Sequence, residues 1–429
     1  MAQRPSLIER IAPARLGPQF RSVLAASISA NFGDGLLIAC GPLLIASITS
    51  DPLLVSLGAF MGQLPWLIIS PFAGIIIDRV RRVPLMLIAS WSRVAVLAIL
   101  IACILTGNLA VWVVYASVFL VGIAEVFLDT TWMTMVPDVV PAEHLGLANA
   151  RLSATSELMN RLLGPALGGF FFAAASWLPY GTTAVMTLLA AYYVSKLKLP
   201  PVSDATASVV VGGTVARVRQ QFRRGIGWLW NHPAMRTLTA LNFVFNLTLM
   251  MSFSVLVLYA REVLGLDAAG YGLLMSVSAM GGLIGAAAYD RLEATFSYTA
   301  MLRVCVVLEA MLHGSLALAS HWAAAAVILF LSGMYMVVWG TICQTIRGRS
   351  VPTRLRGRVT GVYMLASFGG AALGAPIGGV IARAGGVTLA MWWAFGLTAV
   401  AALLVWGLLS TVGRAGEVEP EPGAPGSPS

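Results

Sequence analysis

The stretch Gly74-Ile-Ile-Ile-Asp78-Arg79-Val-Arg81-Arg82 ends one long apolar segment, and Ala286-Ala-Ala-Tyr-Asp290-Arg291 ends another in a similar way 212 residues later. A second pair of related stretches, Gly164-Pro165-Ala-Leu-Gly168-Gly169 and Gly374-Ala-Pro376-Ile-Gly378-Gly379, is separated by 210 residues. Two matches at nearly one offset indicate an internal repeat, so the chain is expected to consist of two related halves.

The composition indicates that lipid is the solvent of most of the chain. Of the 429 residues, 58% are hydrophobic and 10% are charged, and the mean hydropathy is +0.85. Soluble domains carry about 25% charged residues, so this chain lacks the side chains for a normal water-facing surface. The four cysteines, Cys40, Cys103, Cys305 and Cys343, lie singly in apolar segments, which predicts neither a disulfide nor a metal site.

Apolar segments long enough to cross a bilayer recur along the whole chain. A spanning helix needs about 20 mostly apolar residues. Segments that meet this criterion lie at 21–48, 53–77, 85–106, 110–135, 149–175, 179–195, 237–260, 270–289, 299–319, 323–346, 357–382 and 386–410. The sequence therefore predicts an all-α membrane protein with twelve transmembrane helices in two pseudo-symmetric six-helix bundles.

The polar stretches divide the chain into five predicted regions. These are a cytoplasmic N-terminal segment at 1–20, a six-helix bundle at 21–196, a central loop at 197–236, a second bundle at 237–410 and a disordered tail at 411–429. Basic residues and tryptophans at 217–230 predict an amphipathic helix on the cytoplasmic membrane face.

Basic residues set the expected orientation. They cluster in the N-terminal segment and after the second and tenth predicted spans, on the side that carries Arg4, Arg10, Arg15, Arg21, Arg79, Arg81, Arg82, Arg347, Arg349, Arg354, Arg356 and Arg358. The other side carries only Arg261 and Arg383. The positive-inside rule then places both termini in the cytoplasm. Because the net charge of +9 comes from these short loop clusters, we expect lipid contact and no nucleic-acid partner.

The stretch from Gly74 to Arg82 resembles the loop-two signature of the major facilitator superfamily, with Gly74, Asp78, Arg79 and Arg82 in place and Arg81 where the second glycine would stand. Gly164, Pro165, Gly168 and Gly169 resemble the antiporter signature of its drug-exporting members. The stretches 31–35, 122–130, 228–233 and 258–265 resemble the branch that contains macrolide-efflux proteins and the enterobactin exporter. The resemblance implies a bacterial inner-membrane protein with the major facilitator fold that exports small molecules against proton entry.

Carboxylates in apolar helices are the candidates for proton binding, because an ionisable group inside the bilayer must face a partner or a polar path. Asp34 follows Ser27 and Asn31 on one helical face, and Glu125 lies in the fourth predicted span. A fixed ion pair is the alternative role for Asp34. Arg161 is a candidate cation for tuning these carboxylates, although it is also spaced for an intrahelical pair with Glu157.

Further charged positions have expected roles of other kinds. The architecture of the superfamily implies that Asp129 pairs with Arg82, so that Gly74, Asp78, Arg79, Arg82 and Asp129 form a cytoplasmic gate. Arg93 lies about two turns into its span, close enough for its side chain to extend to the interface. Glu309 and His313 are four residues apart, which predicts a structural hydrogen bond, although His can also titrate near neutral pH.

Candidate substrate-lining residues lie at helical spacing in several predicted spans. They are Asn31, Asn242, Asn246, Tyr335 and Trp339, and aromatic side chains in this pattern more often serve packing.

The sequence favours transport over catalysis. It contains no phosphate-binding Gly-x-x-x-x-Gly-Lys-Ser/Thr loop, no His-Glu-x-x-His and no Gly-x-Ser-x-Gly. We therefore expect no enzyme activity, no cofactor and no metal, and a monomer whose ligands are protons and a small molecule such as a macrolide, a tetracycline or a siderophore-like metabolite. A proton-coupled importer is the alternative, and a non-transporting membrane protein is a weaker one.

Overall fold

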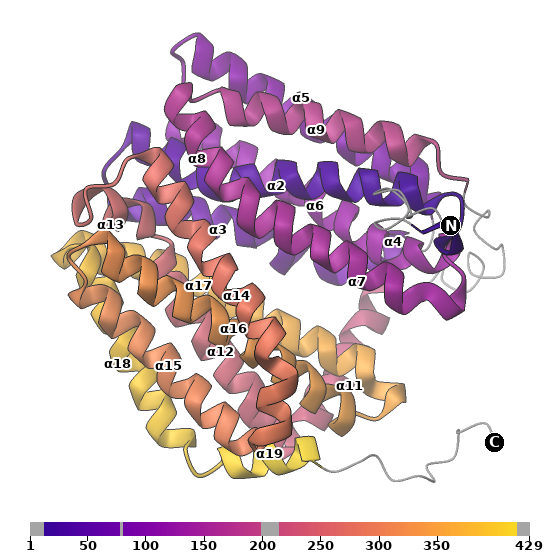
Figure 1. Cartoon of the computed structure of the whole chain (residues 1–429), viewed down its shortest axis with the longest axis vertical. Coiled ribbons are helices and arrows are strands. Elements are labelled where there is room, and N and C mark those ends of the chain that lie inside the picture. The colour runs from indigo at the N-terminus through magenta and orange to yellow at the C-terminus, as the bar shows by residue number, and fades with distance from the viewer. Residues whose placement is uncertain (1–12, 78–79, 199–213, 418–429) are drawn as a thin grey trace, which may run out of the picture. The chain divides into compact units, whose positions relative to one another are not determined.

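The computed structural model describes residues 13–77, 80–198 and 214–417 (Figure 1). Within these ranges the ordered elements are all helices. Nine of the described helices are long and apolar enough to cross a membrane. Each segment predicted as a span lies mainly on helix. The predicted spans at 53–77, 149–175 and 179–195 are not among the nine; the first is divided between α3 and α4, and the second among α7, η3 and α8.

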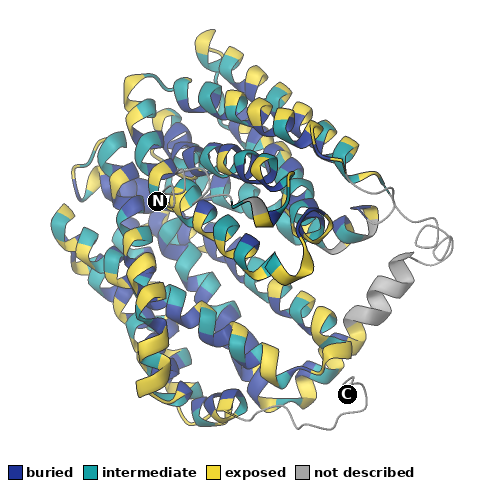
Figure 2. Ribbon diagram, turned by 45° about the vertical axis from the view of Figure 1, so that its right-hand side comes forward, coloured by how far each residue is buried: buried dark blue, intermediate teal, exposed yellow. Residues whose placement is uncertain are grey.

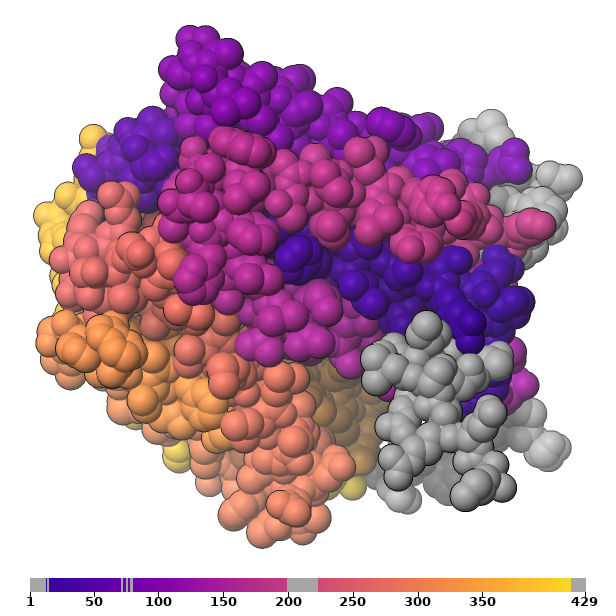
Figure 3. All heavy atoms as spheres, turned by 45° about the horizontal axis from the view of Figure 1, so that its top comes forward, coloured from indigo at the N-terminus to yellow at the C-terminus, as the bar shows by residue number. Residues whose placement is uncertain are grey.

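The chain divides into two compact units, residues 1–212 with 256–279 and residues 213–255 with 280–429. The described helices of the first unit are η1 (Ala14–Leu16), α2 (Phe20–Ile48), α3 (Pro52–Ile68), α4 (Ser70–Ile77), α5 (Arg82–Leu105), α6 (Val111–Val139), η2 (Ala142–His144), α7 (Leu145–Thr155), η3 (Ser156–Leu163), α8 (Gly164–Ala174), α9 (Leu178–Ser195), α13 (Leu256–Glu262) and the first part of α14 (Ala268–Thr295). In this unit α2 packs along α9 (Figure 3).

The second unit contains α11 (Thr214–Asn231), α12 (Pro233–Phe253), the rest of α14, α15 (Tyr298–Leu318), α16 (Trp322–Ser350), η4 (Thr353–Leu355), α17 (Arg356–Gly385), α18 (Val387–Val405) and α19 (Leu409–Glu417). Its largest helix pairing is that of α12 with α17. The helix predicted at 217–230 is present as α11.

The start of α19 corrects one sequence-based expectation. Disorder was expected from residue 411, but Leu409 and Val412 are fully buried where α19 packs on α15 and α16. Arg349 donates to the Gly416 carbonyl at 2.5 Å, which fixes the end of this helix. The amphipathic pattern of a nine-residue helix is too short to stand out against the Gly and Glu residues around it. Residues 418–429 lie outside the described part of the chain.

Local signals in the sequence explain where several helices begin. Asp51 accepts a hydrogen bond from the Leu53 amide at 3.0 Å, and Pro52 occupies the first helical position of α3. Ser297 caps α15 through the Ala300 amide at 3.3 Å. His232 caps α12 in the same way, and burial lowers its pKa, so the neutral imidazole that can accept this bond is favoured.

Exposed residues lie along the outer sides of the helices (Figure 2), and many of them are large apolar residues. Ile88 is 68% exposed, Trp112 is 72% exposed and Leu403 is 78% exposed. Such surfaces are unfavourable in water at about 25 cal/mol per Å² and are neutral in hydrocarbon. The exposed apolar residues agree with the low fraction of charged residues in the sequence, since both indicate that lipid surrounds the helices.

Within each half, glycines let one helix come into close contact with the first helix of that same half. A Cβ atom on Gly168 would meet the Leu36 carbonyl oxygen of α2 at 2.8 Å, and one on Gly378 would meet the backbone of Met251 in α12. Gly168 and Gly378 belong to the two repeated stretches, separated by 210 residues. Each repeat therefore uses its glycine motif in the same way, to let one helix lie directly on the first helix of its half.

Two adjacent glycines of α17 provide a direct test of this packing. A Cβ atom on Gly370 would meet the Phe243 carbonyl oxygen of α12, whereas one on Gly369 would meet nothing within 4 Å. We expect Gly370→Ala to lower the free energy of unfolding by about 1–3 kcal/mol. Gly369→Ala is expected to leave it unchanged or raise it. Thermal unfolding of both purified variants in one detergent measures the difference; equal midpoints would contradict the close approach.

Candidate functional site

A buried ion pair joins α2 and α5 in the first unit. Arg93 Nη2 contacts Asp34 Oδ1, and the side chains are 3% and 14% exposed. The prediction that Arg93 extends to the membrane interface is therefore wrong. Because α5 begins at Arg82, Arg93 lies eleven residues, or about 16 Å, from its start, farther than the side chain can reach. An ion pair of Asp34, the alternative role considered for it, is present in the structure, and whether Asp34 also binds a proton stays a prediction.

Two more carboxylates approach this pair from α6. Glu125 and Asp129 are four residues apart, and both lie within electrostatic reach of Asp34 and Arg93. Glu125 is half-buried and Asp129 is exposed. The cluster of Asp34, Arg93, Glu125 and Asp129 thus contains three acids and one base. If all are ionised, it carries two negative charges in excess, and protonation of one carboxyl group removes half of that excess.

The polar face of α2 continues beside this cluster. The Asn31 side-chain amide donates to the Ser27 carbonyl at 2.8 Å and to the Ser27 hydroxyl at 3.2 Å. These bonds lie along the face that the spacing of Ser27, Asn31 and Asp34 predicts.

The predicted gate pairing is different in the structure. Arg82 contacts Asp138, and it also reaches the Thr134 carbonyl oxygen at 3.3 Å. Asp129, the expected partner of Arg82, instead belongs to the cluster around Arg93. The sequence interpretation ended the fourth span at residue 135, whereas α6 continues to Val139 and presents Asp138 in its last turn. Gly74 is half-buried in α4, and Asp78 and Arg79 lie outside the described residues.

The fifth predicted span contains an irregular segment. Residues Ser156–Leu163 form a π-helix, in which the Gly164 amide bonds to the Met159 carbonyl five residues earlier. Pro165 provides the cause, since it lacks an amide hydrogen and its ring conflicts with the carbonyl group four residues before it. Segments of this kind often occur at functional sites.

The charged residues of this segment pair with each other. Arg161 Nε lies 3.6 Å from Glu157 Oε1, and the two side chains are 61% and 35% exposed. The intrahelical pair is thus present, and the cation in contact with Asp34 is Arg93.

Glycines of the antiporter-like motif lie in two helix contacts within the first unit. A Cβ atom on Gly164 would overlap Gly35 of α2. One on Gly169 would lie 3.0 Å from the Gly272 Cα of α14. Pro165 and Gly168 are buried between these contacts, so the motif serves as a packing surface.

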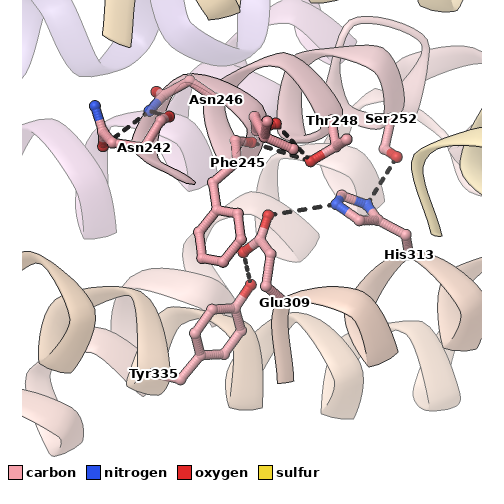
Figure 4. A network of polar contacts seen from close by, with 9 residues as sticks. Asn242, Phe245, Asn246, Thr248, Ser252, Glu309, His313 and Tyr335 are labelled. Carbon is pink, nitrogen blue, oxygen red and sulfur yellow. Dashed lines mark hydrogen bonds and ion pairs between the residues drawn. The ribbon is translucent and has the colours of Figure 1, made fainter. Parts of the chain in front are cut away.

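The candidate substrate residues of the second unit are engaged in contacts with neighbouring residues. Asn242 donates to the Ser367 hydroxyl, and the Asn246 amide donates to the Asn242 carbonyl at 2.8 Å. The Trp339 ring packs on Phe245 with centroids 4.8 Å apart. Tyr335 is buried, and its hydroxyl bonds to Glu309 (Figure 4). Their role in substrate binding stays a prediction.

Comparison with known proteins identifies the family. The transmembrane secretion effector family of the major facilitator superfamily matches residues 9–422. The chain belongs to this family. It is a multi-pass membrane transporter, and its resemblance to the superfamily is confirmed.

Two curated members resemble this transporter along most of their length. The multidrug efflux pump Tap of Mycolicibacterium fortuitum is 26% identical over 382 residues, which cover 85% of this chain and 89% of Tap. An uncharacterised transporter of Bacillus subtilis, YfiS, is 24% identical and covers 92% of both chains.

Solved transporters share the fold. A bacterial homologue of the iron transporter ferroportin, in its inward-facing state, aligns over 95% of this chain and 100% of its own, with a TM-score of 0.71 and 15% identity. The nucleoside transporter NupG (D323A mutant) aligns over 91% of this chain and 99% of its own, also with a TM-score of 0.71, at 10% identity. At these identities the likeness concerns the fold alone.

Among the partners that sequence reasoning missed in this transporter are Arg93 for Asp34, Asp138 for Arg82, and Ser252, whose hydroxyl lies 2.9 Å from His313 Nδ1. A signal existed for the first, because an arginine inside an apolar span requires a carboxylate or a route to water. The other two depend on helix length and on contacts between distant segments, which spacing alone does not specify.

Proposed function

We propose that this transporter is a proton-coupled secondary exporter of small amphiphilic compounds, working by alternating access in the bacterial inner membrane. In this proposal it is a monomer with twelve spans in two six-helix halves and both termini in the cytoplasm. The substrates belong to the class of macrolides, tetracyclines or siderophore-like metabolites. Similarity to the multidrug efflux pump Tap over most of both chains supports export.

The observation that carries proton coupling is the excess of carboxylates around one buried arginine. Asp34, Glu125 and Asp129 share Arg93, so two of the three carboxylates have no cation of their own within the cluster. An uncompensated charge inside a membrane protein is unfavourable, and proton uptake relieves it. Protonation therefore changes the balance between arrangements that expose the cluster to one side or the other.

The proposed cycle follows from this charge balance. A proton from the outer side binds Glu125 or Asp34, which reduces the negative excess and releases part of the attraction on Arg93. The protonated protein returns the empty substrate site toward the cytoplasm, where the carboxyl group loses its proton to water. The ionised cluster then favours the outward movement that carries substrate out.

The test is accumulation of a fluorescent amphiphilic cation, with macrolide and tetracycline probes, in cells that express the transporter. Wild type is expected to lower accumulation, and a protonophore is expected to abolish the effect. Asp34→Asn and Glu125→Gln should each reduce active efflux at least about tenfold. This is the change that corresponds to the loss of one interaction of about 1.4 kcal/mol.

Glu143→Gln is the matched control, because Glu143 is an exposed carboxylate in the short helix η2. It is expected to transport like wild type. Accumulation that rises with expression would indicate an importer, and efflux that persists undiminished with the protonophore would rule out proton coupling.

A further inference from the structure

A second polar cluster lies inside the second unit and joins three helices (Figure 4). Tyr335 of α16 donates its hydroxyl to Glu309 Oε2 at 2.5 Å. On α15, Glu309 Oε1 lies 3.4 Å from His313 Nε2. Ser252 of α12 lies 2.9 Å from His313 Nδ1. The continuous chain Tyr335–Glu309–His313–Ser252 is called the Glu309 cluster below.

The Glu309 cluster is closed to solvent. His313 and Ser252 are 0% exposed, Glu309 is 2% exposed and Tyr335 is 5% exposed. Glu309 and His313 occupy the twelfth and sixteenth positions of the 21-residue span α15, near its middle. Ionisable groups at such depth are costly, and they are characteristic of ion and proton pathways.

The arrangement accommodates one proton. With Glu309 ionised and His313 neutral, the cluster carries one uncompensated negative charge. One added proton, on Glu309 Oε1 or on His313 Nε2, makes it neutral overall. A second proton would leave an uncompensated positive charge in a buried site, which is costly.

The geometry between the two groups leaves that proton exchangeable. Glu309 Oε1 and His313 Nε2 lie 3.4 Å apart, and both atoms are buried without a hydrogen-bond partner in the described part of the chain. The outer atoms of the pair, Glu309 Oε2 and His313 Nδ1, are by contrast held by Tyr335 and Ser252. Glu309 Oε1 and His313 Nε2 therefore face each other in fixed positions without a hydrogen bond between them.

In the described part of the chain, Glu309 has no basic partner within 4 Å other than His313. Arg303 of α15 lies over the Trp406 ring at 5.2 Å. On the adjoining helices, Arg236 of α12 reaches the Trp230 carbonyl and Arg414 of α19 reaches that of Ser410. Arg347 and Arg349 of α16 lie over the rings of Tyr363 and Tyr298.

The remaining titratable neighbours are two thiols and, at the exposed end of α19, Glu417. Cys305 lies within electrostatic reach of Glu309, and Cys343 of α16 within reach of Cys305. Both are neutral groups when protonated. The sequence of α18 contains no ionisable residue. Among the described residues, His313 is thus the basic side chain that lies against Glu309.

We propose that Glu309 and His313 form a second proton-binding site, in addition to the carboxylates around Arg93, and that one proton passes through it in each transport cycle. The proton binds from water on the outer side and leaves to water on the cytoplasmic side, with no other bond formed or broken. This inference rests on the proposed proton coupling and raises its stoichiometry to two protons per cycle.

The test uses purified full-length protein in liposomes, with the membrane potential clamped by valinomycin and potassium, and ethidium as the substrate probe. In wild type the steady-state concentration ratio of probe is expected to change about hundredfold per unit of pH difference, since each coupled proton contributes about tenfold. In Glu309→Gln it should change about tenfold, whereas exchange of labelled for unlabelled probe without a pH gradient should continue.

Glu293→Gln is the matched control. Tyr298 donates its hydroxyl to Glu293, the same pairing that joins Tyr335 to Glu309, but Glu293 is exposed near the end of α14. In this variant the change in the concentration ratio of probe per unit of pH difference, called the slope here, is expected to equal that of wild type. A wild-type slope in Glu309→Gln overturns the second site, while absence of any pH-driven accumulation in wild type overturns the proposed function itself.

Tyr335→Phe decides the matter if Glu309→Gln does not fold. It removes the donor to Glu309 Oε2 and keeps the ring in place. The pH midpoint of pH-driven probe accumulation is expected to differ from that of wild type, because the side chain that holds Glu309 Oε2 in place is gone. An unchanged midpoint in a folded Tyr335→Phe protein contradicts the proposal.

Discussion

Replacing Arg93 with Gln is expected to have the largest effect of any single charge removal in the first unit. Arg93 is 3% exposed and holds Asp34, with Glu125 and Asp129 within electrostatic reach. Breaking a buried ion pair on one side costs about 3–5 kcal/mol, because the remaining charge stays buried without a partner. Folded yield and thermal midpoint should fall strongly, and pH-driven transport should be lost.

A matched arginine and a compensating pair separate charge loss from general damage. Arg303→Gln removes an arginine from a span where it lies over the Trp406 ring, and its effect is expected to be small. Arg93→Gln combined with Asp34→Asn should recover most of the folded yield without recovering transport. If Arg93→Gln is as stable as Arg303→Gln, the ion pair does not hold the two helices together.

The sequence predicted the helical content well because each span carries its own signal. About 20 apolar residues bounded by charges or prolines identify a span without knowledge of its neighbours. The repeated glycine motifs were also informative, since Gly168 and Gly378 make equivalent contacts in their own halves. Signals of this local kind survive in a single sequence.

Side-chain partners were predicted less well, because they depend on depth and on helix length. Arg93 was placed near the membrane interface from a span that began three residues too late, at 85, and its partner Asp34 lies in a helix distant in sequence, which no local pattern indicates. Asp138 was missed because α6 extends beyond residue 135. The π-helix at Ser156–Leu163 depends on how Pro165 is accommodated, which the residue pattern leaves open. A carboxylate in an apolar helix predicts that a partner exists, but packing determines which one.

Packing contacts, which the local sequence does not reveal, also determine the effect of adding a methyl group at Gly35. A Cβ atom there would meet the Asn160 carbonyl oxygen at 2.5 Å and the Met159 carbonyl oxygen at 2.7 Å. Both atoms belong to the backbone of the π-helix, so no side chain can rotate away. We therefore expect Gly35→Ala to destabilise the protein by about 3 kcal/mol, at or above the upper end of usual overpacking costs.

Two other glycines show what the mutation would cost without that backbone contact. Gly41, also in α2, has nothing within 4 Å of its Cβ position. A Cβ atom on Gly58 of α3 would meet the end of the flexible Ile45 side chain, which can adopt another rotamer. Thermal unfolding should rank the three alanine variants, with Gly35 lowest, Gly58 intermediate and Gly41 close to wild type. A Gly35→Ala protein as stable as Gly41→Ala would show that α2 and the π-helix do not meet through their backbones, and the close contact between the first and fifth predicted spans would then be wrong.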